Sequence, residues 1–271
     1  MWILYLALSV ALLYAGFAWF VSRAQTGMLF PVQMAAAGRP ALPALTERLD
    51  LTTADGAQLI GVRLVPQGNL SDPAPLLLGF GGNAWNAEAM ALYLRSLFPD
   101  HEIVTFHYRG YPPSSGEPSA KALFADSVTI FDHLQGERAR EVVAVGFSIG
   151  TGVAAHLAHH RPLAGMILVT PFDTLENLAK EHFPWAPVSL LLRHHMPTID
   201  LVRDRQTPTA LIVAGRDTIV PPRRSEPLRG TIPNLVLDRT IAEAGHNDLY
   251  EHPAFASAMH EALARIEAAA R

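Results

Sequence analysis

The sequence predicts an α/β protein, with an eight-stranded, mostly parallel sheet flanked by helices and preceded by one transmembrane helix. Short apolar, β-branched runs alternate with helix-like segments along most of the chain. That alternation is typical of a parallel sheet that is buried on both faces. A run of about 20 mostly apolar residues without a charged side chain also lies near the N-terminus, and a run of this length can span a bilayer.

Length and composition are consistent with one large domain. The 271 residues are 49% hydrophobic and 17% charged, which is sufficient for a substantial single core. The net charge is −4 and no basic block is present, so we expect no nucleic-acid partner. The chain has no cysteine, which excludes disulfides, a thiol nucleophile and cysteine-based metal sites.

The N-terminal run predicts a membrane anchor over residues 2–22. At a rise of 1.5 Å per residue the run is about 30 Å long, the thickness of a hydrocarbon core. The alternative is a cleaved signal peptide, but no Lys or Arg precedes the run and it is longer than a usual signal core. Arg23 and Arg39 follow it, which favours a cytoplasmic catalytic domain. We therefore expect a single-pass protein of a bacterial inner or cell membrane.

The remaining chain divides into a linker over residues 23–45, with little regular structure, and a domain over residues 46–271. The domain should begin with an antiparallel hairpin and continue with parallel strands and intervening helices. An insertion at about 174–205, rich in Pro, His and bulky apolar residues, interrupts this alternation and predicts a lid of short helices. Strands are expected at 47–53, 58–65, 75–80, 102–107, 142–145, 163–170, 208–215 and 235–240. Helices are expected at about 87–97, from a cap at Ser119 to about 133, at 153–158 and at about 254–270.

The segment Gly146-Phe-Ser-Ile-Gly150 follows a short buried strand and precedes a helix. Strand, G-x-S-x-G and helix together predict a nucleophile elbow, in which Ser148 lies on a sharp turn above the sheet. Side chains two residues before and after the serine would collide across that turn, which explains both glycines. A glycine-rich turn that happens to contain a serine is the alternative.

Two residues after later strands are candidate partners for Ser148. In sheets of this type, active groups gather beyond the carboxyl ends of the strands. Asp217 follows the seventh strand and His246 the eighth, in the order nucleophile, acid, base. Asp173 is the rival acid, although Asp173-Thr-Leu-Glu176 has the pattern of a helix N-cap with a capping-box glutamate.

An oxyanion hole would need two amide donors. The N–H of Ile149, which follows the nucleophile, is one, and Asn83 in the glycine-rich loop after the third strand is the other. The sequence lacks phosphate-binding glycine motifs and His-Glu-x-x-His, so we expect no cofactor and no catalytic metal, despite 12 histidines.

From residue 46 onward the chain resembles the α/β-hydrolase superfamily, and particularly small membrane-anchored hydrolases of the ABHD depalmitoylase and serine-aminopeptidase-like types. The resemblance implies the α/β-hydrolase fold. Relatives usually have His-Gly-Asn-Ala-Gly-Asn where this chain has Gly-Gly-Asn-Ala-Trp-Asn, and this difference implies that Trp85 shapes the acyl pocket. Relatives also usually have Asp at the position where this chain has His107. The matching motifs are Gly-Gly-Asn-Ala at 81–84, Tyr-Arg-Gly-Tyr at 108–111, Gly-Phe-Ser-Ile-Gly at 146–150, Thr-Pro-Phe at 170–172, Gly-Arg-Asp-Thr-Ile-Val-Pro at 215–221 and Gly-His at 245–246.

We therefore expect a serine hydrolase that cleaves a carboxylic ester or thioester through an acyl-enzyme. The anchor and the apolar insertion favour an acylated or lipid substrate, with Trp85, Phe183 and Trp185 binding it. A peptidase or amidase of the same fold is the alternative within the class. A non-catalytic membrane-anchored scaffold is the alternative outside it.

Overall fold

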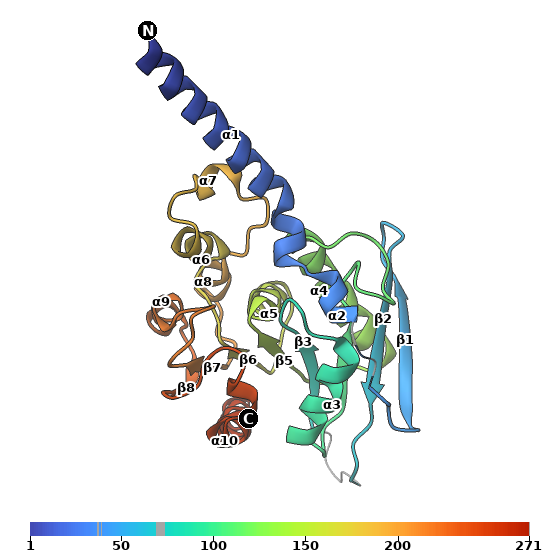
Figure 1. Ribbon diagram of the computed structural model, residues 1–271. Coiled ribbons are helices and arrows are strands. Elements are labelled where there is room, and N and C mark those ends of the chain that lie inside the picture. The colour runs from blue at the N-terminus through green and yellow to red at the C-terminus, as the bar shows by residue number, and fades with distance from the viewer. Residues whose placement is uncertain (37, 39, 69–73, 271) are drawn as a thin grey trace.

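The strands form one eight-stranded sheet (Figure 1). The computed structural model describes residues 1–36, 38, 40–68 and 74–270. The strand order is β1-β2-β4-β3-β5-β6-β7-β8; β2 is antiparallel to both its neighbours, and the pairs from β4 to β8 are parallel. The strands are β1 (Thr46–Thr52), β2 (Gln58–Leu64), β3 (Leu76–Phe80), β4 (Ile103–Phe106), β5 (Val142–Phe147), β6 (Gly165–Val169), β7 (Thr209–Ala214) and β8 (Leu235–Ile241).

The central strands are buried along their whole length. Every residue of β3, β5, β6 and β7 is buried, whereas β1 at the edge is mostly exposed. Because side chains on both faces of these strands enter a core, their sequences are continuous apolar runs. The predicted leading hairpin is confirmed as β1 and β2, which pair from Thr46↔Leu64 to Thr52↔Gln58.

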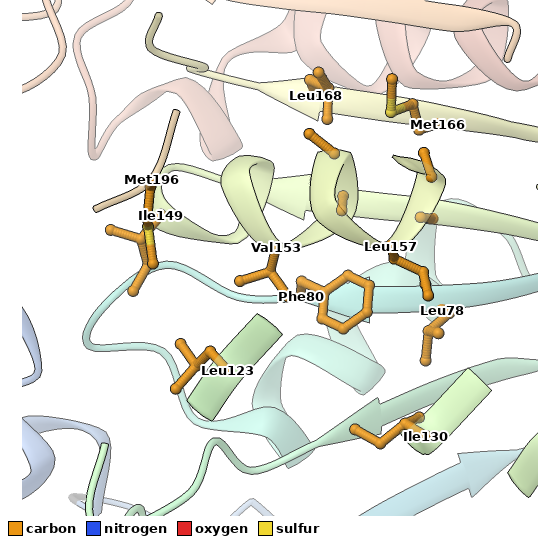
Figure 2. Close-up of a cluster of buried hydrophobic side chains, with 14 of the residues drawn as sticks. Leu78, Phe80, Leu123, Ile130, Ile149, Val153, Leu157, Met166, Leu168 and Met196 are labelled. Carbon is orange, nitrogen blue, oxygen red and sulfur yellow. The ribbon is translucent and has the colours of Figure 1, made fainter. Parts of the chain in front are cut away.

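Helices cover both faces of the sheet and complete two separate cores. On one face, α3 and α10 bury Met90, Leu94, Phe255 and Ile266. On the other face lie α4 and α5, and Figure 2 shows Val153 of α5 beside the ring of Phe80 from β3. The domain helices are α3 (Ala87–Leu97), α4 (Ala120–Glu137), α5 (Ile149–His160), α9 (Glu226–Thr231) and α10 (Pro253–Ala270).

Three short helices between β6 and β7 confirm the predicted helical insertion: α6 (Leu175–His182), α7 (Val188–Leu191) and α8 (Thr198–Val202). The predicted N-cap of α6 is wrong by one residue. Thr174, not Asp173, caps the helix, because its hydroxyl accepts from the amide of Asn177 at 2.9 Å. Glu176 then occupies the second helical position, too early for a capping box, and pairs with Lys180 at 2.7 Å.

The N-terminal segment is more regular than predicted. α1 (Trp2–Leu29) extends well beyond residue 22, and α2 (Val32–Ala36) follows it, so the expectation of little regular structure is wrong for this part of the predicted linker. The side chains of Ser22 and Gln25 bond to the insertion and hold this part of the helix against the domain, and Phe30, 2% exposed, joins the core. In Figure 1, α1 projects from the body of the protein and passes beside α7.

Candidate active site

Ser148 lies on the turn that joins the central strand β5 to α5. Its backbone has φ 51° and ψ −116°, a strained conformation for a residue with a side chain. A Cβ at position 146 would lie 2.5 Å from the carbonyl oxygen of Gly150, as the predicted collision across the turn requires. A Cβ at position 150 would lie 2.1 Å from the carbonyl oxygen of Phe80, so Gly150 is needed to clear the end of β3. Both glycines are therefore steric requirements of the turn.

Asp217 and His246 are brought together from the ends of β7 and β8. His246 Nδ1 lies 2.6 Å from Asp217 Oδ2, and the two side chains are 10% and 1% exposed. The other carboxylate oxygen accepts from the amides of Ile219 at 2.8 Å and Val220 at 2.7 Å. These amides orient the carboxylate toward His246, and an ionised carboxylate at this distance favours the imidazole tautomer with its proton on Nδ1.

Asp173, the rival acid, has different partners. Its Oδ2 accepts from the side-chain amide of Asn177 at 2.8 Å and lies 3.4 Å from the guanidinium of Arg224. Its backbone bonds to Arg224 and Ile199 on either side. Its interactions therefore join α6 to α8 and to the segment before α9, whereas those of Asp217 reach His246.

The loop after β3 passes directly beside the serine. A Cβ at Gly82 would lie 3.7 Å from Ser148 Cβ. The hydroxyl of Tyr108 donates to the carbonyl of Gly81 at 2.7 Å, and that of Tyr111 donates to the carbonyl of Asn83 at 2.7 Å. Because each peptide unit is planar, fixing these carbonyls also fixes the directions of the amides of Gly82 and Ala84, the two neighbours of Asn83. Tyr-Arg-Gly-Tyr is therefore the motif that holds this loop.

Arg109, between the two tyrosines, attaches their loop to the rest of the domain. It forms two hydrogen bonds to the buried Asp126 of α4, at 3.1 and 2.5 Å, and a third to Asp55 in the β1–β2 turn. Burial raises the pKa of Asp126 against the opposing effect of Arg109, whereas the hydrogen bonds from Arg109 and Thr53 lower the pKa of Asp55 to about 2. A buried bidentate pair of this kind is rigid, which keeps both tyrosines in place.

A cavity of about 780 Å³ opens above Ser148. The predicted residues Ser148, Ile149, Asn83 and His246 line it, and Asp217 is connected to this group through His246. All three predicted substrate-binding residues, Trp85, Phe183 and Trp185, also line the cavity. The Trp85 ring packs edge-on against Phe147 at 4.9 Å, which positions it next to the elbow.

Sequence reasoning missed one wall of this cavity. Ala18, Val21, Ser22 and Gln25 of α1 line it together with residues of the insertion. The available signal was the pair Ser22 and Gln25, because polar residues three apart at the end of an apolar run lie on one face of a helix. Nothing in the sequence indicates that this face turns toward Ser148.

The histidines do not form a metal site in the part of the chain that the structure describes, and His156 packs among other rings. Among the residues that the structure describes, no group of three or more His, Asp or Glu side chains is arranged to hold a metal ion. His156 stacks on Phe124 with ring centroids 4.3 Å apart and on His160 at 4.1 Å. Burial, with a smaller effect of the neighbouring histidines, lowers the pKa of His156 to about 4.

Residues 76–194 match the family described as alpha/beta hydrolase fold. An uncharacterized protein of Mycobacterium tuberculosis is 33% identical over 202 residues, which are 72% of this chain and 70% of that protein. The lysophosphatidylserine lipase ABHD12 of Bos taurus is 31% identical over 134 residues, 46% of this chain and 33% of the lipase. The crystal structure of an alpha-beta hydrolase from Vibrio vulnificus superposes with a TM-score of 0.70 at 17% identity, over 92% of this chain and 93% of that one. With its fold, its elbow and these relatives, the chain belongs to the α/β-hydrolase superfamily.

Proposed function

We propose that the protein is a serine hydrolase that cleaves a carboxylic ester or thioester through an acyl-enzyme. The observation that carries the proposal is the 2.6 Å contact between His246 Nδ1 and Asp217, with His246 and Ser148 lining the same cavity. A serine hydroxyl is a weak nucleophile until a base takes its proton, and the base must hold the correct tautomer. The Asp217–His246 pair supports that assignment.

In the proposed reaction, Ser148 Oγ attacks the carbonyl carbon of the substrate while His246 Nε2 takes the hydroxyl proton. The tetrahedral intermediate collapses when His246 returns this proton to the leaving alcohol or thiol, which leaves an acyl-Ser148 ester. A water molecule then attacks the ester with His246 as base, and the acid and the free enzyme are released. Asp217 stabilises the imidazolium in both steps.

The amides of Ile149 and Asn83 are the proposed donors to the oxyanion. Ile149 is the first residue of α5, so its N–H is one of the amides that no helical carbonyl uses. The partial positive charge of that helix end favours the developing oxyanion. Asn83 lines the same cavity as Ile149, in the loop that Tyr108 and Tyr111 hold.

The cavity supports an acyl substrate. Its lining is mostly apolar or aromatic, including Phe172, Leu175 and Leu192 besides Trp85. The lipase named among the relatives cleaves a lipid, which is consistent with this chemistry. Ester, thioester and peptide substrates all pass through the same acyl-enzyme, so a substrate panel must separate them.

The decisive experiment is labelling of the full-length protein with a fluorophosphonate probe. We expect wild type to be labelled, Ser148→Ala to be unlabelled, and Ser96→Ala, on the exposed end of α3, to be labelled as wild type. A folded wild type that stays unlabelled would contradict the proposal and leave a scaffold as the remaining reading. Matched p-nitrophenyl ester, thioester and anilide substrates of one acyl group then identify the scissile bond, and faster anilide cleavage would favour an amidase.

We further propose that residues 2–22 anchor the protein in a membrane with the hydrolase domain on the cytoplasmic side. α1 is long and apolar enough to cross a bilayer, with a mean hydropathy of 2.0 over its most apolar window. A reporter fused to the C-terminus tests this orientation, because a phosphatase reporter is active only outside the cytoplasm and a fluorescent reporter folds inside. Carbonate extraction separates an anchored protein from a cleaved and released one.

A further inference from the structure

Gln25 of α1 joins the helix to the insertion through both ends of its side-chain amide. Its Nε2 donates to the carbonyl of Leu191 at 3.0 Å, and its Oε1 accepts from the amide of Arg193 at 2.7 Å. The hydroxyl of Ser22 also donates to the carbonyl of Leu191, at 3.2 Å. One side chain therefore satisfies a carbonyl at the end of α7 and an amide of the loop after it, and this part of the insertion cannot move from α1 without breaking both bonds.

A second set of contacts lies further toward the N-terminus of α1. The hydroxyl of Tyr14 donates to the carbonyl of Trp185 at 2.7 Å, and the Trp185 ring stacks on Phe17 with centroids 5.3 Å apart. Figure 1 shows α7 beside this part of α1, away from the sheet. Contacts between α1 and the insertion thus extend from Tyr14 to Thr26, whose hydroxyl lies 2.8 Å from His194 Nε2.

The same part of α1 forms a wall of the cavity above Ser148. Ala18, Val21, Gln25 and Leu29 line it, so the wall extends along α1 for about 16 Å at 1.5 Å per residue. Ala18 is only 6% exposed, although most of the helix before it is exposed. The cavity is therefore elongated along α1, between the helix and the insertion.

The register along α1 also fixes the depth of the insertion relative to a bilayer. Tyr14 lies seven residues before Val21, which is about 10 Å inside the apolar run. Trp185, which contacts Tyr14, is 43% exposed, and Leu190 at the tip of the insertion is 82% exposed. The Trp185 carbonyl is bonded to Tyr14, as a backbone group in hydrocarbon must be.

We propose that α1 and the insertion together form an acyl-chain channel that opens into the hydrocarbon layer, so that long-chain acyl esters enter the site directly from the bilayer. This rests on the proposed function of Ser148 and on α1 spanning a membrane. The acyl chain lies along Ala18 and Val21, and its ester carbonyl reaches Ser148 at the inner end of the channel. Gln25 is a positioning residue, because it holds the insertion loop that closes the channel.

Ala18→Phe in the full-length protein, reconstituted in phosphatidylcholine vesicles, tests the channel. The substrates are butyryl and palmitoyl esters of one fluorogenic alcohol, the second dissolved in the same vesicles. A phenyl ring at position 18 narrows the channel at that point, so kcat/KM for the palmitoyl ester should fall about tenfold or more while that for the butyryl ester stays within about twofold. Ala11→Phe is the matched control, because Ala11 is an exposed residue of the same helix and does not line the cavity.

A second variant tests the loop without adding bulk. Gln25→Ala should raise KM for the palmitoyl ester several-fold with little change in kcat for the butyryl ester, and the exposed Gln206→Ala should match wild type. Fluorophosphonate labelling of every variant reports whether Ser148 remains functional. Unlabelled wild type would overturn the proposed function itself, whereas full labelling with unchanged chain-length selectivity in both Ala18→Phe and Gln25→Ala would overturn the channel alone.

Discussion

Replacing Asp217 with Asn should nearly abolish activity while leaving the fold intact. An Asn at this position can still accept from the amides of Ile219 and Val220 with its oxygen, because these bonds use Oδ1. Its NH₂ group then faces His246 Nδ1, where Oδ2 now accepts at 2.6 Å. Two donors cannot face each other, so His246 must carry its proton on Nε2 and cannot act as a base toward Ser148.

The expected loss follows from this change of tautomer. In triads of this type, the Asp-to-Asn change lowers kcat by about 10⁴-fold, which corresponds to about 5 kcal/mol of transition-state stabilisation. Stability should change much less, because the two backbone hydrogen bonds to Oδ1 remain. Steady-state hydrolysis of a short p-nitrophenyl ester measures kcat, and the midpoint of thermal unfolding shows whether the variant is folded.

Asp173→Asn is the matched control, because it makes the same change at the rival carboxylate. Asp173 bonds to Asn177 and lies near Arg224, so its substitution should lower kcat by no more than a few-fold and reduce stability. If Asp217→Asn kept more than about a tenth of wild-type kcat, or if Asp173→Asn lost as much as Asp217→Asn, the assignment of Asp217 as the acid would be refuted.

Three further perturbations test the surroundings of the site. Tyr111→Phe removes the donor to the part-buried carbonyl of Asn83, which should cost about 0.5–1.5 kcal/mol of unfolding free energy and lower kcat by about 10- to 100-fold. Urea unfolding and ester kinetics measure the two effects, and an unchanged kcat would contradict the role given to this tyrosine. Gly150→Ala should prevent folding, because its Cβ would lie 2.1 Å from a backbone carbonyl oxygen. Gly136→Ala, in open space on α4, should instead stabilise the protein by about 0.5–1 kcal/mol. A Gly150→Ala protein that is soluble and folded would contradict the steric argument. His156 has a folded-state pKa of about 4 against an ordinary value of 6.5, so the unfolded chain takes up its proton first as the pH falls. About 1–2 kcal/mol of stability, after allowance for solvent screening, should therefore be present above pH 6.5 and lost toward pH 4. Urea titrations at several pH values should show a loss toward pH 4 that is smaller by this amount in His156→Asn than in wild type, and equal losses would contradict the assignment to His156.

Much of the fold could be predicted because it depends on local patterns. The continuous apolar runs of β3, β5, β6 and β7 predict buried parallel strands, and the glycines around Ser148 predict a tight turn for a steric reason that the structure confirms. The spacing of residues after strands placed Asp217 next to His246, since adjacent parallel strands end at one edge of the sheet. Their catalytic roles stay predictions until activity is measured.

The missed features depend on contacts between distant segments. A helix N-cap at Asp173 was a reasonable local prediction, but backbone bonds to Arg224 and Ile199 hold that residue outside α6. The wall that α1 contributes to the cavity depends on bonds between residues more than 160 positions apart, such as Gln25 and Leu191, which no local pattern encodes. The tyrosines at 108 and 111 were noted as a motif, but their hydroxyls act through carbonyls on another loop.

The bonds between Gln25 and the insertion also mean that α1 cannot rotate freely relative to the domain. If α1 spans a bilayer, the tilt of the helix therefore sets the orientation of the whole domain relative to the membrane. Adding one residue to α1 between Tyr14 and Gln25 would rotate these two contact points by about 100° relative to each other, so they could no longer grip the insertion together. In a membrane, the length of α1 would therefore set the distance of Ser148 from the bilayer, and the rotation of α1 about its axis would set the direction in which the cavity faces.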